Sequence, residues 1–322
     1  MAKYLVTGIA GFIGSSIARE LLSRGETVRG LDDFSTGKWA NIEEIKDDID
    51  FRGVSLLDRG GVVAACEGID YVLHQAALPS VPKSVAEPEL THAVNVNGTL
   101  NLLLAARDAR VKRVVYAASS SAYGESEVLP KREDMIPRPI SPYAVQKLTG
   151  EYYLQAFAAV YGMETVSLRY FNIFGPRQDP TSQYSGVLAK FITQMQQGES
   201  PTIFGDGEQS RDFTFIANAV KANLKASIAP AKDVSGKVFN IATGTRYTLN
   251  QTFDMLRKII GFSGSVKHAA PRSGDIRHSL ANIGMAQKHL GYSADVGFEE
   301  GLGKTVEWYQ RHVVTPVDMQ QV

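Results

Sequence analysis

A glycine-rich turn between an apolar strand and an amphipathic helix opens this chain, and it constrains the fold more than any other stretch. Residues 4–6 form a short apolar run of the kind found in buried parallel strands, and the run breaks at Gly8. Apolar residues then recur at helical spacing over residues 12–22, and Gly25 ends that helix. A strand, a glycine turn and a helix in this order gather unpaired backbone N–H groups at the positive end of a helix dipole, where an anion binds. The stretch therefore predicts an α/β fold with a Rossmann-type doubly wound parallel sheet that holds a dinucleotide.

The spacing of three glycines and one aspartate sharpens this prediction. Gly8 permits a tight turn, Gly11 lets a pyrophosphate approach the backbone, and Gly14 lets the helix pack close to the strand. Glycines also cluster in ordinary turns, so the triplet counts here because it follows a strand directly. Asp32 follows the next expected strand, at residues 27–31, where a carboxylate accepts hydrogen bonds from ribose hydroxyls and repels a ribose phosphate. We therefore expect NAD rather than NADP.

Further strands should end along the same edge of the sheet and bring the residues after them to the cofactor. We expect strands at residues 51–54 and 71–75, and the small residues after the second would let the backbone come close to the cofactor. His74 lies near the end of that strand, where a histidine is more often a hydrogen-bonded core residue than a catalytic one. The cofactor contacts predicted in these loops are Asp33, Phe34, Ser35, Gly37, Ser55, Leu56, Gln75, Ala76 and Ala77.

Length and composition bound the remaining choices. The chain has 322 residues, a hydrophobic content of 44% and a formal net charge of zero, so it can bury a sizeable core, and we expect two lobes around one cleft. The balanced charge offers no basic surface to nucleic acid, and no apolar run is long enough to cross a membrane. Cys66 is the only cysteine, and the first strand leaves no room for a signal peptide, so we expect a cytoplasmic protein without disulfides. No metal site is predicted.

Two stretches in the middle of the chain bring hydroxyl, phenol and ammonium groups together. A fifth strand, expected at residues 113–118, runs into three serines, and a long helix is expected from Tyr143 to about residue 161. The serines form either a solvated turn or, at the carboxyl end of that strand, a site beside the nicotinamide. Tyr143 and Lys147 are four residues apart and share a helix face, although such a pair also arises by chance. Because an ammonium favours the phenolate, Tyr143 becomes a usable base with Lys147 and Ser119 beside it.

These motifs resemble the extended short-chain dehydrogenase/reductase superfamily and, within it, the nucleotide-sugar epimerases. The cofactor and catalytic motifs match at Thr7-Gly8-x-x-Gly11-Phe12-Ile13-Gly14, at Ser119-Ser120 and at Tyr143-x-x-x-Lys147. Residues 169–176, 211–213 and 272–277 resemble the family's nucleotide-sugar-binding segments, so the resemblance covers nearly the whole chain. Residues 74–82 are most similar to UDP-N-acetylglucosamine 4-epimerases, which carry the same His-Gln-Ala-Ala-Leu and Ser-Val-Pro pattern.

The resemblance implies how the chain is divided and which reaction it performs. It implies an NAD-binding domain at residues 1–175, rejoined by about 212–245, and a smaller α/β nucleotide-sugar-binding lobe at residues 176–322. The implied reaction is NAD-dependent 4-epimerisation of a UDP-hexose through a 4-keto intermediate, with UDP-GlcNAc and UDP-GalNAc favoured and UDP-Glc and UDP-Gal also possible. Alternatives on the same fold are a UDP-uronate 4-epimerase, a 4,6-dehydratase, a decarboxylase, a keto-sugar reductase and a non-catalytic NAD-sensing protein.

The resemblance also extends the sets of contact residues. In the cofactor site it adds Phe12, Ile13, Tyr143, Lys147 and Tyr170. With it, the predicted substrate contacts are Pro79, Ser80, Ser119, Ser120, Ser121, Tyr143, Asn172, Gly186, Val187, Thr202, Ile203, Phe204, Arg211, Arg272, Asp275 and Ser279. Two residues depart from the family pattern, since Ala217 and Asn282 stand where the family usually has aspartate. We expect these departures to alter caps or turns in the sugar lobe rather than catalysis.

The second half of the chain predicts helices at residues 184–197, 249–260 and 298–311 and strands at 165–170 and 238–241. Residues 78–84 and 124–142 read as loops, and residues 89–109 as one long helix. Three arginines, Arg211, Arg272 and Arg277, are candidates to bind a sugar diphosphate, which suits planar charged donors. The first two are expected on loops.

Two small residues, Gly186 and Ser279, are expected to flank the hexose. In similar epimerases that take only non-acetylated sugars, the position of Ser279 carries a tyrosine, so a serine would leave room for an N-acetyl group. The alternative is that Ser279 is a turn residue far from the ligand. The resemblance also implies a homodimer built from the helices that begin near residues 89 and 143.

Overall fold

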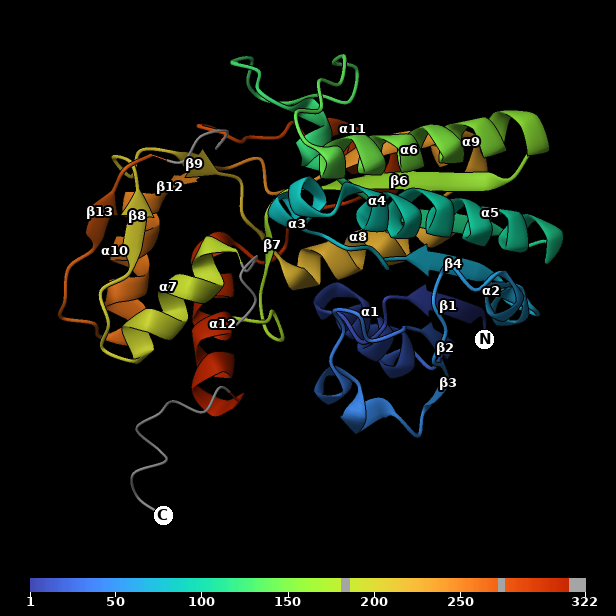
Figure 1. Ribbon diagram of the computed structural model, residues 1–322, viewed down its shortest axis with the longest axis horizontal. Helices are drawn as coiled ribbons and strands as arrows, with labels where there is room; N and C mark the ends of the chain where they lie inside the picture. Colours follow the sequence, from blue (N-terminus) through green and yellow to red (C-terminus); the bar gives the residue numbers. More distant parts are fainter. Residues whose placement is uncertain (181–185, 272–275, 313–322) are drawn as a thin grey trace.

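A seven-stranded sheet forms the centre of the larger lobe in the computed structural model, which describes residues 1–180, 186–271 and 276–312 (Figure 1). Its strands are β1 (Lys3–Thr7), β2 (Thr27–Leu31), β3 (Ile49–Arg52), β4 (Tyr71–His74), β5 (Arg113–Ser119), β6 (Glu164–Tyr170) and β11 (Lys237–Ile241). All pairings are parallel, and the order across the sheet is β11-β6-β5-β4-β1-β2-β3. The strand order reverses between β1 and β4, and open sheets bind ligands beyond the carboxyl ends of the strands at such a point.

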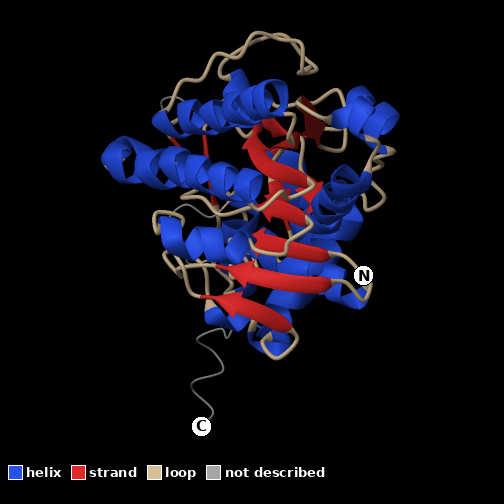
Figure 2. Cartoon of the chain, turned by 90° about the vertical axis from the view of Figure 1, so that its right-hand side faces the viewer, coloured by secondary structure: helices blue, strands red, loops and turns tan. Residues whose placement is uncertain are grey.

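Helices cover both faces of this sheet, as Figure 2 shows from the side. One face is covered by α1 (Phe12–Ser23) and α8 (Ile216–Ile228), with α9 (Ala231–Val234) and α11 (Gly284–Leu290) toward the β11 edge. The other face is covered by α2 (Arg59–Cys66), α5 (Gly98–Asp108) and α6 (Pro142–Tyr161). This is the doubly wound α/β arrangement that the opening glycine turn predicts. None of the described helices is both long and apolar enough to cross a membrane.

Successive residues of the central strands point into two separate cores. Tyr4 and Val6 of β1 join the cluster beneath α1 and α8, whereas Leu5 between them joins the cluster beneath α2, α5 and α6. The same alternation separates Val115 from Val114 in β5. Strands that are buried on both faces need apolar residues at nearly every position, which explains why their sequences are continuous rather than alternating apolar runs.

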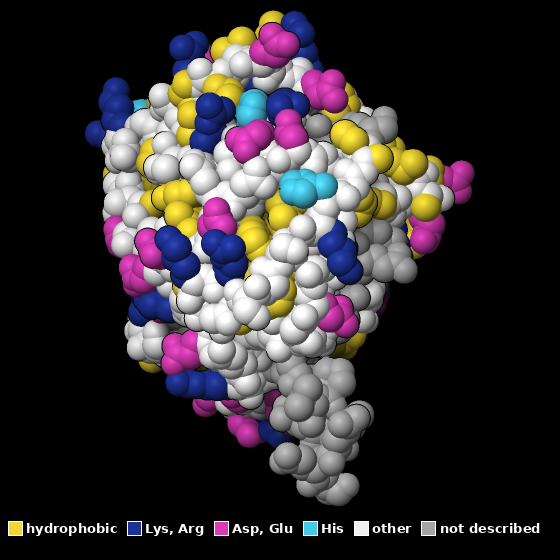
Figure 3. All heavy atoms as spheres, turned by 90° about the vertical axis from the view of Figure 1, so that its left-hand side faces the viewer, with side chains coloured by type: hydrophobic (Ala, Val, Ile, Leu, Met, Phe, Trp, Pro, Cys, Tyr) yellow, Lys and Arg dark blue, Asp and Glu magenta, His cyan; other side chains and the backbone are white. Residues whose placement is uncertain are grey.

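The smaller lobe is built from short paired strands and three longer helices. The strand pairs are β7 (Ile173–Phe174) with β10 (Thr214–Phe215), β9 (Ser210–Arg211) with β12 (Tyr247–Thr248), and β8 (Thr202–Phe204) with β13 (Lys267–Ala269). The helices are α7 (Val187–Gln196), α10 (Leu249–Ile260) and α12 (Phe298–His312). Acidic and basic side chains are mixed over the outer face of this lobe in Figure 3, in keeping with the zero net charge.

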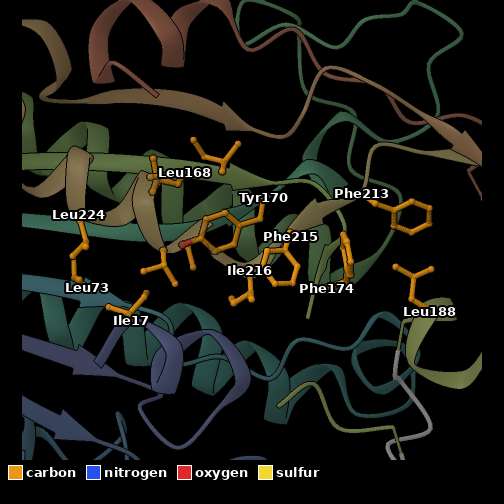
Figure 4. Packing of buried hydrophobic residues seen from close by; sticks show 14 of the residues in the cluster. Ile17, Leu73, Leu168, Tyr170, Phe174, Leu188, Phe213, Phe215, Ile216 and Leu224 are labelled. Atoms are coloured by element: carbon orange, nitrogen blue, oxygen red, sulfur yellow. The ribbon is translucent and has the colours of Figure 1, made fainter. Parts of the chain in front are cut away.

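One hydrophobic cluster runs from beneath the sheet into the smaller lobe. In Figure 4, Leu168 and Tyr170 of β6 are followed by Ile216 and then by the ring of Phe174. Beyond Phe174 the cluster continues through further aromatic rings of the smaller lobe, among them Phe213, Phe215 and Phe298. The two lobes therefore share a core instead of meeting across a polar boundary.

Most predicted elements are present, and the differences have local causes. The third strand lies at Ile49–Arg52 rather than at residues 51–54, because Val28 of β2 pairs with Ile49 and the backbone turns after Arg52. The expected loop at residues 78–84 contains α3 (Val81–Ala86), which Ser80 caps at its N-terminus. The expected helix at residues 89–109 consists of α4 (Pro88–His92), a π-helical turn (Ala93–Asn97) and α5. Three short 3₁₀ turns complete the elements: η1 (Trp39–Asn41), η2 (Glu43–Ile45) and η4 (Ser120–Tyr123).

Candidate active site

The glycine turn after β1 brings the backbone of three segments into close contact. Gly8 has φ of +69°, and a side chain on it would meet the backbone of Ala76 at 2.7 Å. A Cβ on Gly14 would lie 2.1 Å from the carbonyl oxygen of Gly8, so helix α1 packs against the turn more closely than any side chain allows. The start of α1, with its unpaired N–H groups, therefore faces the carboxyl edge of the sheet, as a dinucleotide pyrophosphate requires. The turn fits the expected cofactor.

Asp32 lies at the end of β2 beside this turn and is buried. Its carboxylate accepts hydrogen bonds from the backbone N–H of Ala10 (2.9 Å) and of Phe34 (2.8 Å), which joins the glycine turn to the loop after β2. A Cβ on Gly37 would lie 2.8 Å from the same carboxylate. Burial raises the pKa of Asp32, while the two N–H donors lower it. An aspartate held at this strand end is suited to accept the ribose hydroxyls of NAD.

The residues after β4 are held by a ring of three side chains. The Tyr170 hydroxyl donates to Gln75 Oε1 (3.1 Å), Asn223 Nδ2 donates to the Tyr170 hydroxyl (2.7 Å), and Gln75 Nε2 donates to Asn223 Oδ1 (3.0 Å). Burial raises the pKa of Tyr170 to about 12, so its hydroxyl stays protonated. The ring connects β4, β6 and α8 at the edge of the sheet where the cofactor is expected. Asn223 carried no sequence signal, because only the fold brings it to Gln75.

His74 is a buried hydrogen-bonded residue, as expected, and not an acid or base. Its ring nitrogens contact the hydroxyls of Thr7 (2.8 Å) and Thr99 (3.0 Å). Burial lowers the pKa of His74 to about 3, and the nearby Lys147 ammonium acts in the same direction. The neutral ring therefore links β1, through Thr7, to α5, through Thr99.

The phenol, the ammonium and the serine hydroxyl meet at the carboxyl end of β5. Helix α6 begins with Ser141 as its cap, whose Oγ accepts the N–H of Ala144 at 3.2 Å, and this places Tyr143 in the first turn. The Tyr143 phenol lies beside Ser119 at the end of β5, and Lys147 Nζ donates to the carbonyl oxygen of Ala117 at 2.9 Å. Burial raises the pKa of Tyr143 to about 12 and the nearby Ser119 hydroxyl lowers it, whereas burial lowers the pKa of Lys147 to about 7.

The neighbouring serines have local roles. Ser121 donates its N–H (3.2 Å) and its hydroxyl (2.8 Å) to the Ser119 oxygen, within the 3₁₀ turn η4 (Ser120–Tyr123). The backbone N–H of Tyr143 donates to the buried hydroxyl oxygen of Ser84 in α3 at 3.0 Å. Ser80, expected beside the sugar with Pro79, uses its hydroxyl to cap α3 by accepting the N–H of Lys83. Helix α3 therefore holds the backbone of Tyr143 through Ser84. The sequence does not predict this role, because residues 78–84 read as a loop.

A cavity of about 400 Å³ opens in the smaller lobe and is lined by six of the sixteen predicted substrate contacts. The predicted residues that line it are Asn172, Gly186, Val187, Thr202, Phe204 and Arg211. Asn172 has φ of +38°, an unfavourable conformation for a residue with a side chain, and its Nδ2 donates to the carbonyl oxygen of Asp212 at 3.0 Å. Arg211 stands in the short strand β9 rather than on a loop. We call this the substrate cavity.

Several predictions about this lobe need correction or fall outside the described residues. Ile203 is wrong as a lining residue, because the alternation along β8 turns its side chain into the core, where it is fully buried. Ser279 is not among the described residues that line the substrate cavity; its N–H donates to the Ser210 carbonyl oxygen at 2.9 Å. Arg272 and Asp275 lie outside the described residues, as does the expected start of a helix at residue 184. Arg277 is exposed and pairs with Asp206 at 3.0 Å.

A second depression, of about 520 Å³, lies at the ends of α7, α10 and α12. None of the described residues that line it carries an ionisable side chain, so it offers no acid, base or charged anchor. The polar groups that chemistry needs are at the carboxyl edge of the sheet instead.

Comparisons with known proteins agree with this geometry. Residues 4–242, most of the chain, match the NAD dependent epimerase/dehydratase family. The chain belongs to that family. Among its relatives, the UDP-glucose 4-epimerase of Mycolicibacterium smegmatis is 37% identical over 96% of this chain and 98% of that protein. The UDP-glucuronate 4-epimerase of Thermodesulfobacterium geofontis is 31% identical over 97% of this chain and 98% of that protein.

Two solved structures of family members superpose on nearly the whole chain. The UDP-glucose 4-epimerase of Thermotoga maritima, with UDP-glucose, is 38% identical at a TM-score of 0.92, covering 97% of this chain and all of that one. The UDP-N-acetylglucosamine 4-epimerase of Methanobrevibacter ruminantium, in complex with UDP-N-acetylmuramic acid, is also 38% identical at a TM-score of 0.92, covering 97% of this chain and 99% of that one. The predicted superfamily, the Rossmann-type fold, the enzyme class and the NAD cofactor are confirmed, and the relatives support nucleotide-sugar 4-epimerisation.

The two departures from the family pattern lie at helix starts. Asn282 accepts the N–H of Gly284 through its side-chain oxygen at 2.8 Å, before α11, so the amide serves the turn that an aspartate would serve. Ala217 is exposed in the first turn of α8, where it offers no carboxylate to the helix N-terminus. Both positions lie outside the groups that meet at Tyr143.

Asp212 stands between Arg211 and Phe213, two residues that line the substrate cavity, and its carboxylate joins chain segments next to them. The sequence does not indicate this role within the Arg211-Asp212-Phe213 motif. The Asp212 carboxylate is fully buried and accepts the N–H of Thr243 (2.9 Å), of Gly244 (3.0 Å) and of Ala281 (3.2 Å), and the Thr243 hydroxyl (2.7 Å). Burial raises the pKa of Asp212, and these donors lower it. The carboxylate therefore joins three chain segments next to Arg211. These segments are distant in sequence, and only the folded chain brings them together.

Proposed function

We propose that this enzyme interconverts the two epimers at carbon 4 of a UDP-hexose and that it accepts UDP-GlcNAc and UDP-GalNAc. The observation that carries the proposal is the contact between Tyr143 and Ser119 at the carboxyl edge of the sheet, with the buried Lys147 ammonium one turn further along α6. In this proposal residues 1–175, rejoined by about 212–245, hold the cofactor, and residues 176–322 hold the sugar nucleotide in the substrate cavity.

The proposed reaction begins with a proton transfer at the sugar. The Tyr143 phenolate removes the proton of the 4-hydroxyl, and Ser119 steadies the oxygen as it becomes a carbonyl. NAD, held at the carboxyl edge of the sheet, would supply a hydride acceptor and donor at carbon 4. The keto sugar would turn about its diphosphate so that its opposite face is reduced, and Tyr143 would give its proton back to the oxygen. No co-substrate is consumed.

The charges around Tyr143 decide whether it can act as a base. Burial alone would keep the phenol protonated, since it raises the pKa of Tyr143 to about 12. A protonated Lys147 favours the phenolate and lowers that pKa. The same lysine is placed to orient the nicotinamide ribose. The proposal therefore requires that Lys147 remain charged at the working pH.

The cavity and its arginine suit a nucleotide diphosphate. Arg211 lines the substrate cavity together with Phe204 and Thr202, which offer a ring and a hydroxyl for the base. A planar, permanently charged guanidinium is the side chain best matched to a diphosphate. Asn172, strained and fixed by its bond to Asp212, is placed to hold a sugar hydroxyl or the diphosphate.

The choice of an N-acetyl sugar rests on volume. We infer that Gly186, which lines the substrate cavity, leaves room beside the hexose for an acetamido group in both of its orientations. Ser279 is not among the described residues that line that cavity, and the variant Ser279→Tyr tests whether it also adjoins the hexose. One family member similar to this chain is named UDP-N-acetylglucosamine 4-epimerase, which supports this choice. Other relatives are named for UDP-glucose and UDP-glucuronate, so those sugars are included in the test.

Enzymes of the same fold that catalyse other reactions differ in the residues of the serine turn. Sugar-nucleotide dehydratases and decarboxylases that resemble this chain carry an acidic residue just after the serine or threonine. Here Ser120 and Ser121 occupy those positions, which favours simple epimerisation.

We also propose a homodimer through α5 and α6. Helix α6 exposes large apolar side chains, Val145 at 49% and Tyr152 at 52%, one heptad apart on one face. Such a stripe is suited to helix–helix contact between two copies. Light scattering should give twice the chain mass, and Tyr152→Glu should give monomers; a wild-type monomer would contradict this part of the proposal.

One experiment tests the reaction. The purified enzyme is incubated with UDP-GlcNAc, UDP-GalNAc, UDP-Glc, UDP-Gal and the two UDP-uronates, and proton NMR follows the anomeric signals. We expect the partner epimer to appear without added or consumed cofactor. A dehydrated sugar, stoichiometric consumption of NADH, or no turnover with NAD still bound would instead indicate a dehydratase, a reductase or a cofactor-sensing protein.

A further inference from the structure

A fully buried ion pair lies under the catalytic helix. Glu151 of α6 has no exposed surface, and the Arg169 side chain of β6 is 4% exposed. Their contact is bidentate, with Arg169 Nε donating to one carboxylate oxygen at 2.9 Å and Nη2 to the other at 2.7 Å. Removing two charges from water is costly, and such a pair is often no more stabilising than apolar residues of the same size. The pair therefore invites an explanation other than stability.

The position of Glu151 relative to Lys147 suggests an electrostatic role for the pair. Glu151 follows Lys147 by one helical turn on the same face of α6, which runs along β6 in Figure 1. The Lys147 ammonium donates to a neutral acceptor, the Ala117 carbonyl oxygen, and lies 4.9 Å from the centre of the Tyr116 ring. Among the described residues, Glu151 is the carboxylate whose charge acts on this ammonium.

Arg169 is itself held in place by contacts with its neighbours. Its guanidinium lies 4.6 Å from the centre of the Tyr123 ring, and the Tyr123 hydroxyl donates to Asn240 Oδ1 at 2.7 Å. Arg169 also directly precedes Tyr170, whose hydroxyl belongs to the ring with Gln75. Both carboxylate oxygens of Glu151 are therefore fixed from the sheet side.

We propose that Glu151, held by Arg169, is a positioning residue that keeps the Lys147 ammonium charged and thereby keeps Tyr143 usable as a base. This inference rests on the role of Tyr143 in the proposed function. A carboxylate one turn away compensates a buried ammonium that has no other countercharge among the described residues. Burial raises the pKa of Glu151, and the bidentate contact with Arg169 lowers it and fixes the orientation of the carboxylate.

The surroundings of Lys147 agree with this role. Burial lowers the pKa of Lys147 to about 7, and Glu151 acts against burial by raising it. The titratable and charged groups that face Lys147 among the described residues are His74 from β4, Tyr116 from β5, Tyr143 and Glu151 from α6 itself and, through Glu151, Arg169 from β6.

The test is a charge cycle with a readout that needs no sugar. The variants are Glu151→Gln, which leaves Arg169 unpaired, and the double variant Glu151→Gln with Arg169→Gln, which removes both charges. The holoenzyme is titrated with pH, and the near-ultraviolet phenolate signal is taken as the difference between each protein and the same protein carrying Tyr143→Phe. This difference reports the apparent pKa of Tyr143 with the cofactor bound.

The matched control is Glu164→Gln. It breaks the contact in which one carboxylate oxygen of Glu164, Oε2, accepts both Nε (2.9 Å) and Nη2 (2.6 Å) of the buried Arg113, and this contact joins β6 to β5 at their amino ends. A general effect of breaking an arginine–glutamate pair would appear equally in this variant.

We expect Glu151→Gln to raise the apparent pKa of Tyr143 by about 1 pH unit or more. The reason is that Lys147 loses its proton without Glu151, and the loss of an opposite charge within ~4–6 Å of the phenolate shifts a pKa by about 1–3 units. The double variant should shift it less than Glu151→Gln alone, because no unpaired guanidinium remains, and Glu164→Gln should not shift it. The acid limb of kcat/KM should move to higher pH in the same order, with at least about a tenfold loss at neutral pH in Glu151→Gln.

Two results would overturn the inference: an unchanged pKa of Tyr143 in Glu151→Gln, or equal shifts in Glu151→Gln and Glu164→Gln. Should Glu151→Gln not fold, the double variant decides alone, since it leaves no unpaired guanidinium, and an unchanged pKa of Tyr143 there would be equally contrary. A protein that shows these shifts but epimerises no sugar would remove the proposed function and keep the role of Glu151; epimerisation without the shifts would do the reverse.

Discussion

The two lobes hold the polar groups of the site in different ways. In the sheet lobe, Asp32, Gln75 and Ser119 stand at or just after the ends of strands of one seven-stranded sheet, and each is fixed by hydrogen bonds. In the smaller lobe, Arg211 stands in a two-residue strand, and the neighbouring Asp212 carboxylate joins the segments at Thr243 and Ala281. The groups proposed for proton transfer are therefore on one continuous sheet, whereas the groups proposed for sugar recognition are on short strands and loops.

This difference separates chemistry from selectivity. A change at the sheet edge should alter the rate or the cofactor and leave the choice of sugar unchanged. A change in the smaller lobe should alter the choice of sugar and leave the proton transfer intact. The variants below test that division.

The largest expected effect belongs to Tyr143→Phe, which removes the proton acceptor and keeps the ring. We expect kcat to fall by about 100-fold or more for every sugar, with NAD still bound after gel filtration. Tyr152→Phe, an exposed tyrosine on the same helix, is the control and should keep its rate. A Tyr143→Phe enzyme with more than about a tenth of the wild-type turnover would argue against a direct role as base.

A selective effect is expected for Ser279→Tyr in the smaller lobe. Overpacking by one ring costs about 1–3 kcal/mol in protein cores, so turnover of the N-acetyl sugars should drop by about 10-fold or more while the unacetylated pair is kept. The unacetylated sugars serve as the internal control in the same NMR assay. An unchanged rate on UDP-GlcNAc would show that Ser279 lies away from the sugar.

Asp32→Ala should weaken NAD and narrow the preference for NAD over NADP. The substitution removes the carboxylate that accepts the ribose hydroxyls and repels a ribose phosphate, and we expect about a tenfold weaker binding of NAD. Cofactor titration measures both constants, with the exposed Asp48→Ala as the control. If the preference between the two cofactors does not change, Asp32 is not at the ribose.

The smallest effect concerns the sheet itself. The folded state holds His74 neutral down to about pH 3, while an unfolded histidine takes up a proton near 6.5. The unfolded state therefore binds more protons below that pH, and the free energy of unfolding should fall by about 1.4 kcal/mol for each pH unit below 6.5. Urea unfolding measures the free energy of unfolding at two pH values. This free energy should change less with pH in His74→Gln than in the wild type, but not in the exposed control His92→Gln. An equal change with pH in both variants would contradict the prediction.

The sequence predicts the sheet lobe better than the smaller lobe for a physical reason. Helix α6 carries its own boundaries, because Ser141 and Pro142 start it and Gly162 ends it in a left-handed conformation. Signals of that kind are local and can be recognised in a single chain. They are sufficient to place Tyr143 and Lys147 on one helix face.

The features that the sequence does not predict are contacts between residues that are distant in sequence. Ser84 supports the Tyr143 backbone across 59 positions of sequence, and Asp212 reaches Ala281 across 69. Ile203 is wrongly predicted as a wall of the cavity because a three-residue strand does not reveal which face is buried. Such contacts follow from the folded topology, and a local pattern cannot contain them.

The hydrophobic cluster that runs from Tyr4 under the sheet to Tyr309 in α12 has a mechanical consequence. Proteins that close around a ligand by a hinge usually have a thin, polar junction between their domains, which these lobes lack. We therefore expect the two lobes to melt in one cooperative transition and to keep their spacing through a catalytic cycle. A sugar that reverses its orientation between the two lobes would therefore do so while the distance between the lobes stays constant.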